Sequence, residues 1–240
     1  MYITIFLVSF VLSTFFAIGG VGSAVAIVPI MHFLGLPFDF SKAIGLFVNT
    51  STTITATFMN LKRKTLDIKF ALPLAITLAL FAPLGAIYSK YISVEIVKLL
   101  FGLSLFFSAS MILFGKKEQK YNIQNRYIIL IIGAIIGVFS GLLGIGGGSL
   151  LLPILILIGY DAKKVATALS FIIPFSTLSA FLTYINFIEV DWFILIVSAV
   201  GAILGGYVGN YLMHFKLNPS QIKKIIAILL YIISLKMIFF

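Results

Sequence analysis

Two glycine-rich strings contain the residues of this chain best suited to chemistry. They are Gly144-Ile-Gly-Gly-Gly-Ser149 and Gly19-Gly-Val-Gly-Ser23, and an apolar stretch of helical length follows each. Glycine permits positive φ and close approach of a ligand to the main chain. A helix that starts after such a break leaves N–H donors unpaired, with the positive end of the helix dipole behind them. This arrangement favours a small anion without a charged side chain, and no basic residue lies near either string in the sequence. The predicted substrate-binding residues in the strings are Gly20, Gly22, Ser23, Gly144, Gly146, Gly147, Gly148 and Ser149.

The same glycines have an alternative role, because small residues let transmembrane helices pack closely. The duplication favours binding, since Pro29 and Pro153 each lie nine residues after the first glycine of the motif. A nucleotide site is excluded, because a phosphate-binding loop needs Lys and then Ser or Thr after its glycines, and here Ser149 and Leu150 follow.

Polar residues inside the apolar stretches form a second candidate set. Asn49 is joined by Thr50, Ser51, Thr52, Thr53 and Thr55, and the matching region of the second half holds Ser170, Ser176, Thr177 and Ser179. Asn49 is a candidate substrate-binding residue because a buried amide needs a partner, although a purely structural partner would also satisfy it. The individual Ser and Thr hydroxyls could donate to oxyanion oxygens, but we favour hydrogen bonds between helices or to the backbone carbonyl one turn earlier.

Other chemistry has few residues to support it. The chain has no Cys, 2 His and 7 acidic residues, so thiolate chemistry and sulfur-ligated metals are excluded. All the acids fall at predicted span ends or in loops, and no nucleophile–base pair or carboxylate pair is present. We therefore predict no enzyme activity, no metal and no cofactor. His32 is the one titrating group expected inside the membrane, and a hydrogen-bonded packing role is the simpler interpretation.

Composition identifies an integral membrane protein. Apolar residues make up 61% of the 240 positions and charged residues only 10%, with a mean hydropathy of +1.19. A soluble domain is about half apolar and a quarter charged, so a soluble enzyme is excluded. The net charge of +10 does not indicate nucleic-acid binding, because the basic residues form short clusters between apolar runs, as cytoplasmic loops do. The expected partners are the lipid bilayer and a small anionic substrate.

Apolar runs of about 20 residues can cross a bilayer. Six such runs lie near 43–60, 70–89, 94–114, 164–185, 192–213 and 220–239. Two further runs, 2–34 and 127–159, are too long for one ordinary span, and each contains one of the glycine strings in its middle. The polar connector 115–126 divides the chain almost in half.

The two halves resemble each other. Gly20, Gly22 and Pro29 match Gly144, Gly146 and Pro153 at an offset of 124, and Asp67 matches Asp191 at the same offset. Further along, Gly85 and Tyr91 match Gly205 and Tyr211 at an offset of 120. Coincidences of Gly, Pro and Asp in one order indicate an internal repeat. We therefore divide the chain into a first repeat, 1–114, a cytoplasmic loop, 115–126, and a second repeat, 127–240, within one membrane domain.

The distribution of basic residues favours inverted repeats. If each glycine-broken stretch crossed the membrane once, the repeats would be parallel and the 17 basic residues would divide almost evenly between the two sides. If each is instead a re-entrant hairpin, only Lys42, Lys90, Lys98 and Lys236 lie outside. The positive-inside rule favours the second arrangement. The predicted fold is an all-α integral membrane protein with two inverted repeats, each a re-entrant helical hairpin plus three transmembrane helices.

The segment Ser140-Gly-Leu-Leu-Gly-Ile-Gly-Gly-Gly-Ser-Leu-Leu-Leu-Pro153 resembles the signature of the sulfite exporter TauE/SafE family of membrane permeases. Ala17-Ile-Gly-Gly-Val-Gly-Ser-Ala-Val-Ala-Ile-Val-Pro29 is a degenerate first copy, with Ser23 and Ala24 in place of Gly147 and Gly148. The resemblance covers essentially the whole chain. It implies transport of sulfite, sulfonates or related sulfur compounds.

These observations together predict a transporter of a small sulfur-containing anion that works by alternating access. A passive anion channel with the same site is the alternative. The expected location is the plasma membrane, as a multi-pass protein, and the Lys- and Ile-rich composition is typical of a prokaryote. The sequence leaves the oligomeric state, the coupling ion and the direction of transport open.

Overall fold

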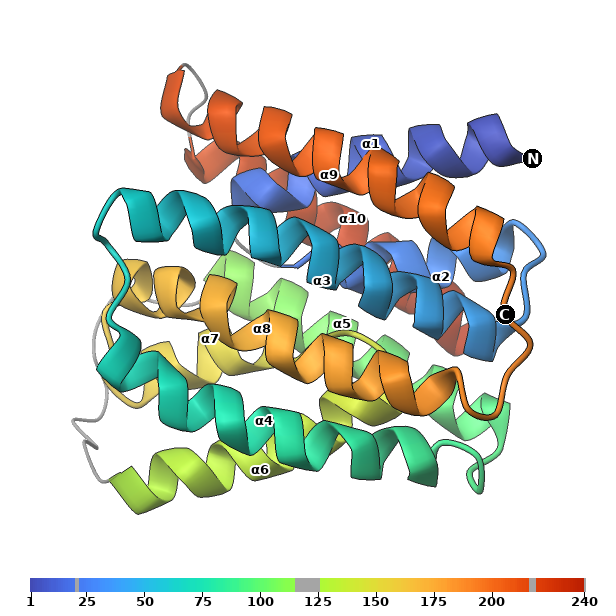
Figure 1. The fold of residues 1–240 in the computed structure, drawn as a ribbon, viewed down its shortest axis with the longest axis horizontal. Helices are drawn as coiled ribbons and strands as arrows, with labels where there is room; N and C mark the ends of the chain where they lie inside the picture. The colour runs from blue at the N-terminus through green and yellow to red at the C-terminus, as the bar shows by residue number, and fades with distance from the viewer. Residues whose placement is uncertain (20–21, 115–125, 216–218, 240) are drawn as a thin grey trace.

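The computed structural model of the chain is helical throughout the residues it describes, which are 1–19, 22–114, 126–215 and 219–239 (Figure 1). No strand occurs in those ranges. The first half contains α1 (Tyr2–Gly19), α2 (Ala24–Phe33), α3 (Phe38–Lys62), α4 (Ile68–Tyr88) and α5 (Val94–Phe114). The second half contains α6 (Arg126–Leu143), α7 (Gly148–Leu157), α8 (Ala162–Tyr184), α9 (Trp192–Phe215) and α10 (Pro219–Phe239).

The six predicted spans correspond to α3, α4, α5, α8, α9 and α10. Each glycine-broken run is divided into a longer and a shorter helix at its glycine string, as expected. The helices α4, α5, α8 and α9 contain stretches long and apolar enough to cross a membrane. By contrast, α3 carries the Asn, Ser and Thr cluster, which gives it a more polar composition.

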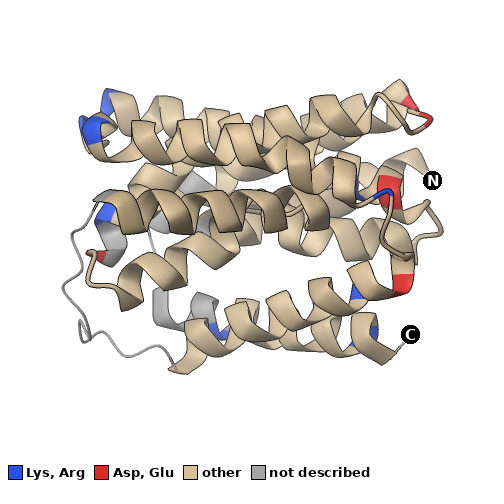
Figure 2. Ribbon diagram, turned by 90° about the horizontal axis from the view of Figure 1, so that it is seen from below, with Lys and Arg blue, Asp and Glu red and all other residues tan. Residues whose placement is uncertain are grey.

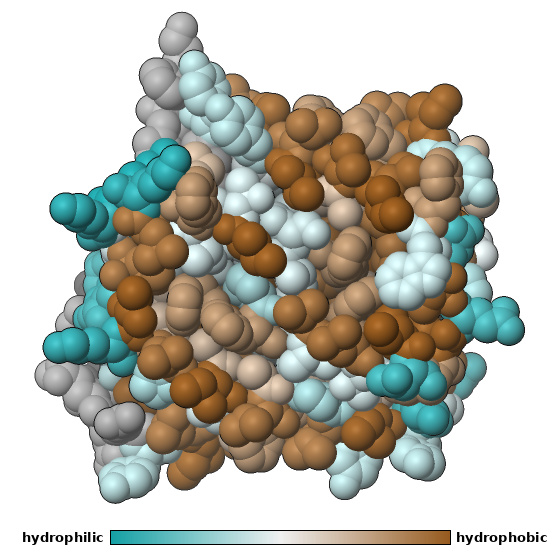
Figure 3. Space-filling model, in the orientation of Figure 1, coloured by the Kyte–Doolittle hydropathy of each residue, from teal (hydrophilic) through white to brown (hydrophobic). Residues whose placement is uncertain are grey.

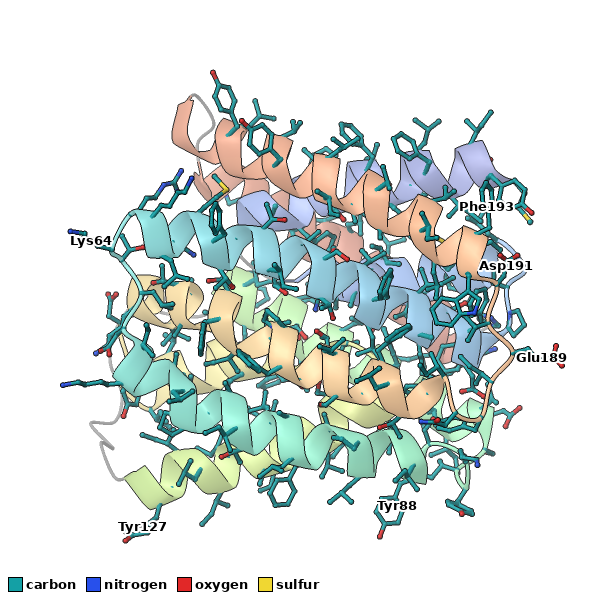
Figure 4. All side chains as sticks on the ribbon, in the orientation of Figure 1. Lys64, Tyr88, Tyr127, Glu189, Asp191 and Phe193 are labelled. Carbon is teal, nitrogen blue, oxygen red and sulfur yellow. The ribbon has the colours of Figure 1, made fainter. Side chains whose placement is uncertain are left out.

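The helices run roughly parallel to one long direction of the molecule, and charges gather at its two ends (Figure 2). We call one end basic, because it carries Lys62, Arg63, Lys64 and Lys164, and the other acidic, because it carries Asp39, Glu95, Glu189 and Asp191. Figure 4 labels Lys64 at the first end and Glu189 and Asp191 at the second. Both chain termini lie at the acidic end (Figure 1). Between the ends the surface is mostly apolar (Figure 3), as expected for a protein surrounded by lipid.

Contacts between loops identify which turns share an end. Lys164 Nζ lies 2.9 Å from Asp67 Oδ2, so the turn before α4 and the start of α8 lie at the same end. Lys90 Nζ lies 4.7 Å from the ring centroid of Phe187, which joins the turn after α4 to the turn after α8 at the other end. Parallel repeats would separate each of these pairs by the membrane thickness.

Helices of one half pack mainly on helices of the other. The helix α1 packs along α9, and α6 packs in the same way along α4; the central pairs are α3 with α8 and α5 with α10. Exchanging the two halves leaves this pattern of neighbours unchanged. The buried side chains form two clusters, one around α2, α3 and α5 and the other around α4, α7 and α8.

Repeated glycines explain the closest of these helix pairs. A Cβ on Gly85 of α4 would overlap the carbonyl oxygen of Val138 on α6, and a Cβ on Gly205 of α9 would overlap that of Phe10 on α1. The two glycines match at an offset of 120 and have the same packing role in each half. At these two positions glycine allows two helices to pack closely.

Candidate functional site

The loop between α6 and α7 is held in a conformation that favours glycine. Gly144, Gly146 and Gly147 have φ of 73°, 77° and 73°, in the left-handed region that L side chains rarely adopt. Gly147 is the N-cap of α7 and its carbonyl accepts bonds from Leu150 and Leu151. Within the described residues, the N–H groups of Gly146, Gly147, Gly148 and Ser149 make no hydrogen bond. Four donors are therefore grouped at the positive end of a helix.

Asn49 lies between the two glycine strings. A Cβ built on Gly22 would stand 2.6 Å from Asn49 Oδ1, and one built on Gly146 would stand 2.5 Å from Asn49 Nδ2. The amide is fully buried, and its Nδ2 reaches the carbonyl of Ile145 at 3.4 Å. One polar side chain from the middle of α3 therefore contacts both loops, which lie more than a hundred residues apart in the sequence.

The same place contains polar atoms without partners. Asn49 Oδ1, Ser23 Oγ and Ser149 Oγ are buried and make no hydrogen bond within the described chain. Ser9 and Ser13 of α1 are the two other buried side chains in this condition. Leaving a buried donor or acceptor unpaired costs about 1–3 kcal/mol. Three such atoms beside two glycine strings therefore favour a site whose polar partner is a ligand.

The predicted site residues are mostly brought together. Gly22, Asn49 and Gly146 meet directly, and Ser23 and Ser149 stand at the starts of α2 and α7. A Cβ on Gly148 would meet Ile173 at 2.5 Å, so this position faces an apolar side chain. Gly20 lies outside the described residues.

The two halves of the site differ. Ile173 occupies the position that matches Asn49 at the repeat offset of 124. A Cβ on Gly146 would meet Asn49, Thr177 and Ile173, whereas the three atoms nearest to a Cβ on Gly22 all belong to Asn49. The difference between Ser23 and Gly147 in the motif adds to this asymmetry.

The Ser and Thr hydroxyls bond mainly to backbone, and that prediction is confirmed. Thr50, Ser51, Thr52, Thr53 and Thr55 each donate to a carbonyl one turn earlier. Three contacts cross from α3 to α8 as well. Thr50 Oγ1 lies 2.6 Å from Thr177 Oγ1, and nearer the basic end Thr57 and Asn60 donate to the carbonyl and the hydroxyl of Ser170. A polar face of α3 thus follows α8 from mid-helix to the basic end.

The acidic residues stand where the sequence predicts. Asp39 and Glu95 lie in the first turns of α3 and α5, Asp67 and Asp161 are N-caps, and Glu189 and Asp191 lie between α8 and α9. Glu118 lies outside the described residues. His32 Nδ1 lies 3.0 Å from the carbonyl oxygen of Leu36, and its ring packs against Phe38. Its packing interpretation is confirmed.

The expectation that no basic side chain lies near the glycines is wrong at one residue. A Cβ on Gly144 would stand 2.6 Å from Lys42 Cβ and 2.9 Å from its Cγ, so the stem of Lys42 crosses this glycine. Lys42 is only 1% exposed. The predicted span began at 43 and left Lys42 outside it, but α3 begins at Phe38 after Pro37. The signal that could have found it is Pro37, because proline often precedes a helix start.

Comparison with known proteins identifies the chain's relatives. The family described as Sulfite exporter TauE/SafE matches residues 5–237. The probable membrane transporter protein YunE of Bacillus subtilis is 27% identical over 92% of this chain and 91% of its own length. A probable membrane transporter protein of Methanocaldococcus jannaschii is 28% identical over 75% of this chain and 71% of its own. The probable membrane transporter protein ORF9 of a Sinorhizobium species is 27% identical over 96% and 88%.

Proposed function

The chain belongs to the sulfite exporter TauE/SafE family, and from this premise we propose that it transports a small sulfur-containing anion such as sulfite or a sulfonate. As a membrane transporter of that family it is a multi-pass protein, and the proposed location is the plasma membrane of a prokaryotic cell. The observation that carries the proposal is Asn49, whose buried and unpaired amide oxygen lies between the glycines of two separate loops.

The donors around Asn49 suit an oxyanion. The free N–H groups from Gly146 to Ser149 can each donate to an oxygen of the anion, and α7 directs its positive end toward the same place. The hydroxyls of Ser23 and Ser149 add two donors. The amide of Asn49 can donate through Nδ2 and accept through Oδ1, so it suits both a sulfonate and a hydrogensulfite ion that carries one proton.

Helix lengths support a site near the middle of the membrane. The helices α2 and α7 have 10 residues each, which at about 1.5 Å per residue is roughly half of a 30 Å hydrocarbon core. The helix α2 leads to the acidic end and α7 to the basic end (Figure 1). Asn49 is the twelfth of 25 residues of α3. These lengths agree with two re-entrant hairpins that meet at mid-depth from opposite sides.

The inverted topology is part of the proposal. The Lys164–Asp67 and Lys90–Phe187 contacts support it, because each joins turns that parallel repeats would put on opposite sides. The unchanged pattern of helix neighbours on exchange of the halves supports it as well. The basic end then faces the cytoplasm and both termini face outward.

Alternating access would open the contact between α3 and α8 first on one side and then on the other. The bonds from Thr57 and Asn60 to Ser170 close this contact between Asn49 and the basic end. Rigid movement of one repeat against the other, about a fixed site, would open this contact on one side of the site while closing it on the other. Opening toward the cytoplasm therefore requires these bonds to break.

Transport by purified protein in proteoliposomes tests the function. Vesicles loaded with sulfite, sulfate, methanesulfonate or taurine are diluted into buffer containing a trace of the labelled compound. A transporter accumulates label transiently in exchange for the internal pool, which a passive channel does not do beyond the limit set by the membrane potential. Label accumulation with sulfite or a sulfonate, lost in Gly146→Ala, is the expected result. Failure of all four compounds to exchange would contradict the proposal.

A further inference from the structure

A buried cation lies beside the proposed site. Of the Lys, Arg, Asp and Glu side chains that the structure describes, only that of Lys42 is buried. Its Nζ lies 2.6 Å from Asp39 Oδ1 and donates to Ser89 Oγ at 2.5 Å. The rings of Phe38 and Tyr184 flank it, with centroids 5.1 and 5.0 Å away. An ionisable side chain inside a membrane segment is expensive and commonly functional.

The Lys42 cluster, meaning Lys42 with Asp39, Ser89 and Tyr184, connects helices of both repeats. Lys42 and Asp39 belong to α3, Ser89 caps the end of α4 and Tyr184 ends α8. The Tyr184 hydroxyl lies 3.0 and 3.2 Å from the carbonyls of Gly141 and Leu142 at the end of α6. Residues at the C-terminal ends of α4, α6 and α8 thus meet at the Lys42 cluster, directly or through the Tyr184 hydroxyl. Repeats that move apart at this end must break the cluster.

A depression at the acidic end borders Asp39 of this cluster. It has a volume of about 520 Å³ and is lined by Pro37, Asp39, Phe40, Ile188, Glu189, Val190 and Asp191. The Asp39 side chain is 44% exposed, whereas Lys42 is 1% exposed. Asp39 therefore touches the depression while its partner lies behind it.

Gly144 of the second glycine string packs against the same cluster. The Lys42 stem crosses Gly144, and Asn49 stands seven residues further along α3, which is two turns or roughly 10 Å on the same face. The order along α3 from the acidic end is the depression, Asp39, Lys42 and then Asn49. Along α3, Lys42 therefore stands between Asn49 and the acidic end.

We propose that Lys42 is the gating residue on the acidic side of the anion path, and that it exchanges Asp39 for the anion as the anion passes. The inference rests on the proposed function, because the anion it serves is the one bound at Asn49. In the closed arrangement the ammonium is neutralised by Asp39. In the open arrangement it supplies the positive charge that the glycine strings lack.

A purely structural ion pair is the competing explanation, and the two differ in charge selectivity. A structural pair would be replaceable by apolar side chains with little effect. A gating lysine would instead let anions pass faster than cations. The reporter is Ser149→Cys in this Cys-free chain, labelled from the acidic side by two methanethiosulfonates, one carrying a sulfonate and one a trimethylammonium group. Each labelling rate is divided by the rate of the same reagent with a free thiol in solution.

The test compares this reporter in the parent, Asp39→Asn and Asp39→Asn/Lys42→Met backgrounds. Asp39→Asn frees Lys42, so the sulfonate reagent should label the thiol at position 149 at least tenfold faster than in the parent. Adding Lys42→Met should lower the ratio of anionic to cationic labelling rates at least tenfold. The double variant buries no unpaired charge. If Asp39→Asn does not fold, Ser89→Ala removes the other bond to Lys42 and should raise labelling by the sulfonate reagent severalfold.

Two results would overturn the inference: a charge ratio unchanged by Lys42→Met, or labelling at the parental rate in both Asp39→Asn and Ser89→Ala. Protection of the thiol at position 149 by added methanesulfonate, which does not react with the reagents, reports separately on the proposed function. Protection that disappears in Gly146→Ala supports the binding site whatever the charge ratio does. If the ratio of anionic to cationic labelling rates depends on Lys42 but the thiol at position 149 is not protected, the result supports the gate and not the binding site.

Discussion

Gly146 combines two features that a side chain would disturb. Its φ of 77° is strained for any other residue, and a Cβ would meet both Asn49 and Thr177 at 2.5 Å. Gly146→Ala should therefore move the N–H donors or the amide. Losing two charge-assisted contacts of about 1.5–3 kcal/mol each would weaken anion binding more than a hundredfold, as measured by calorimetric titration of sulfite.

Gly133→Ala is the matched control for that substitution. Its Cβ would meet only the flexible ends of Leu74 and Leu78, at 3.1 and 3.3 Å, and of Thr77 at 3.5 Å, and it lies on α6 away from the loop. Affinity should stay near that of the parent, and Ser149→Ala should fall between the two because it removes a single hydroxyl. If Gly146→Ala folds and binds like Gly133→Ala, the glycine serves packing.

Substitutions of Asn49 and Asn60 distinguish the effect of the site from the effect of the rest of the α3–α8 contact. Both are amides on α3, but Asn60 donates to Ser170 near the basic end, whereas Asn49 keeps an unpaired oxygen between the loops. Asn49→Ala should weaken equilibrium binding of sulfite more than tenfold, and Asn60→Ala should leave it within about twofold. Equal effects would mean that the amides act only by holding the two helices together.

At the residue scale, the sequence predicted several residues that the structure brings together and missed one buried cation. The glycines and Asn49 were predictable because few residue types suit a broken helix or a buried amide inside an apolar run. Lys42 was not recognised, since a lysine one residue before a predicted span looks like an interfacial residue. Helix ends are poorly defined by hydropathy alone, and a predicted start at 43 in place of Phe38 turned a buried cation into a loop residue.

At the scale of elements, Asp67 links α4 to α8 in the other half of the chain. Its carboxylate accepts from the N–H of Phe70 as the N-cap of α4 and pairs with Lys164. Hydrogen bonds from Lys164 and from Phe70 lower the pKa of Asp67 below its ordinary value. Asp67→Ala should destabilise the protein by about 1 kcal/mol through loss of the cap, and Asp67→Asn should lose less.

The pH dependence of that contribution has a definite sign. A lowered pKa in the folded state means that the stabilisation is complete above the ordinary aspartate pKa and is lost as pH falls through the folded-state value. Thermal melting in detergent from neutral pH to about pH 3 should therefore show an acid-dependent loss that Asp67→Asn reduces. An identical pH profile in the two proteins would remove Asp67 from this account.

The sequence did not predict which helices pack against each other. Hydropathy predicts the extent of the spans, and the glycine strings predict the breaks in 2–34 and 127–159. The packing of α1 on α9 and of α6 on α4 depends on which apolar faces fit closely, and one apolar face resembles another in a sequence read alone. Gly85 and Gly205 were partly informative. They occupy matched positions in the two halves, but the sequence does not identify the helices that they contact.

For the whole molecule, the proposed inverted topology gives a direct labelling prediction. Asn186 is exposed at the acidic end and Thr65 at the basic end. In intact cells an impermeant maleimide should label Asn186→Cys and should not label Thr65→Cys or Ser220→Cys. Reaction of Ser220→Cys from outside would restore the parallel arrangement, in which each glycine-broken run crosses once. The charge distribution alone predicted which end faces the cytoplasm, because basic clusters are segregated so strongly.

The proposed function requires an anion to bind where the two glycine loops meet Asn49. Selenite is a close analogue of sulfite, and its selenium gives an anomalous signal in crystals of the unlabelled protein. The predicted result is one strong anomalous peak within hydrogen-bonding reach of the Asn49 amide and the N–H groups of Gly146 to Ser149, absent from crystals of Gly146→Ala. A peak found only among the basic residues near Lys64 and Lys164, with none beside Asn49, would contradict the account.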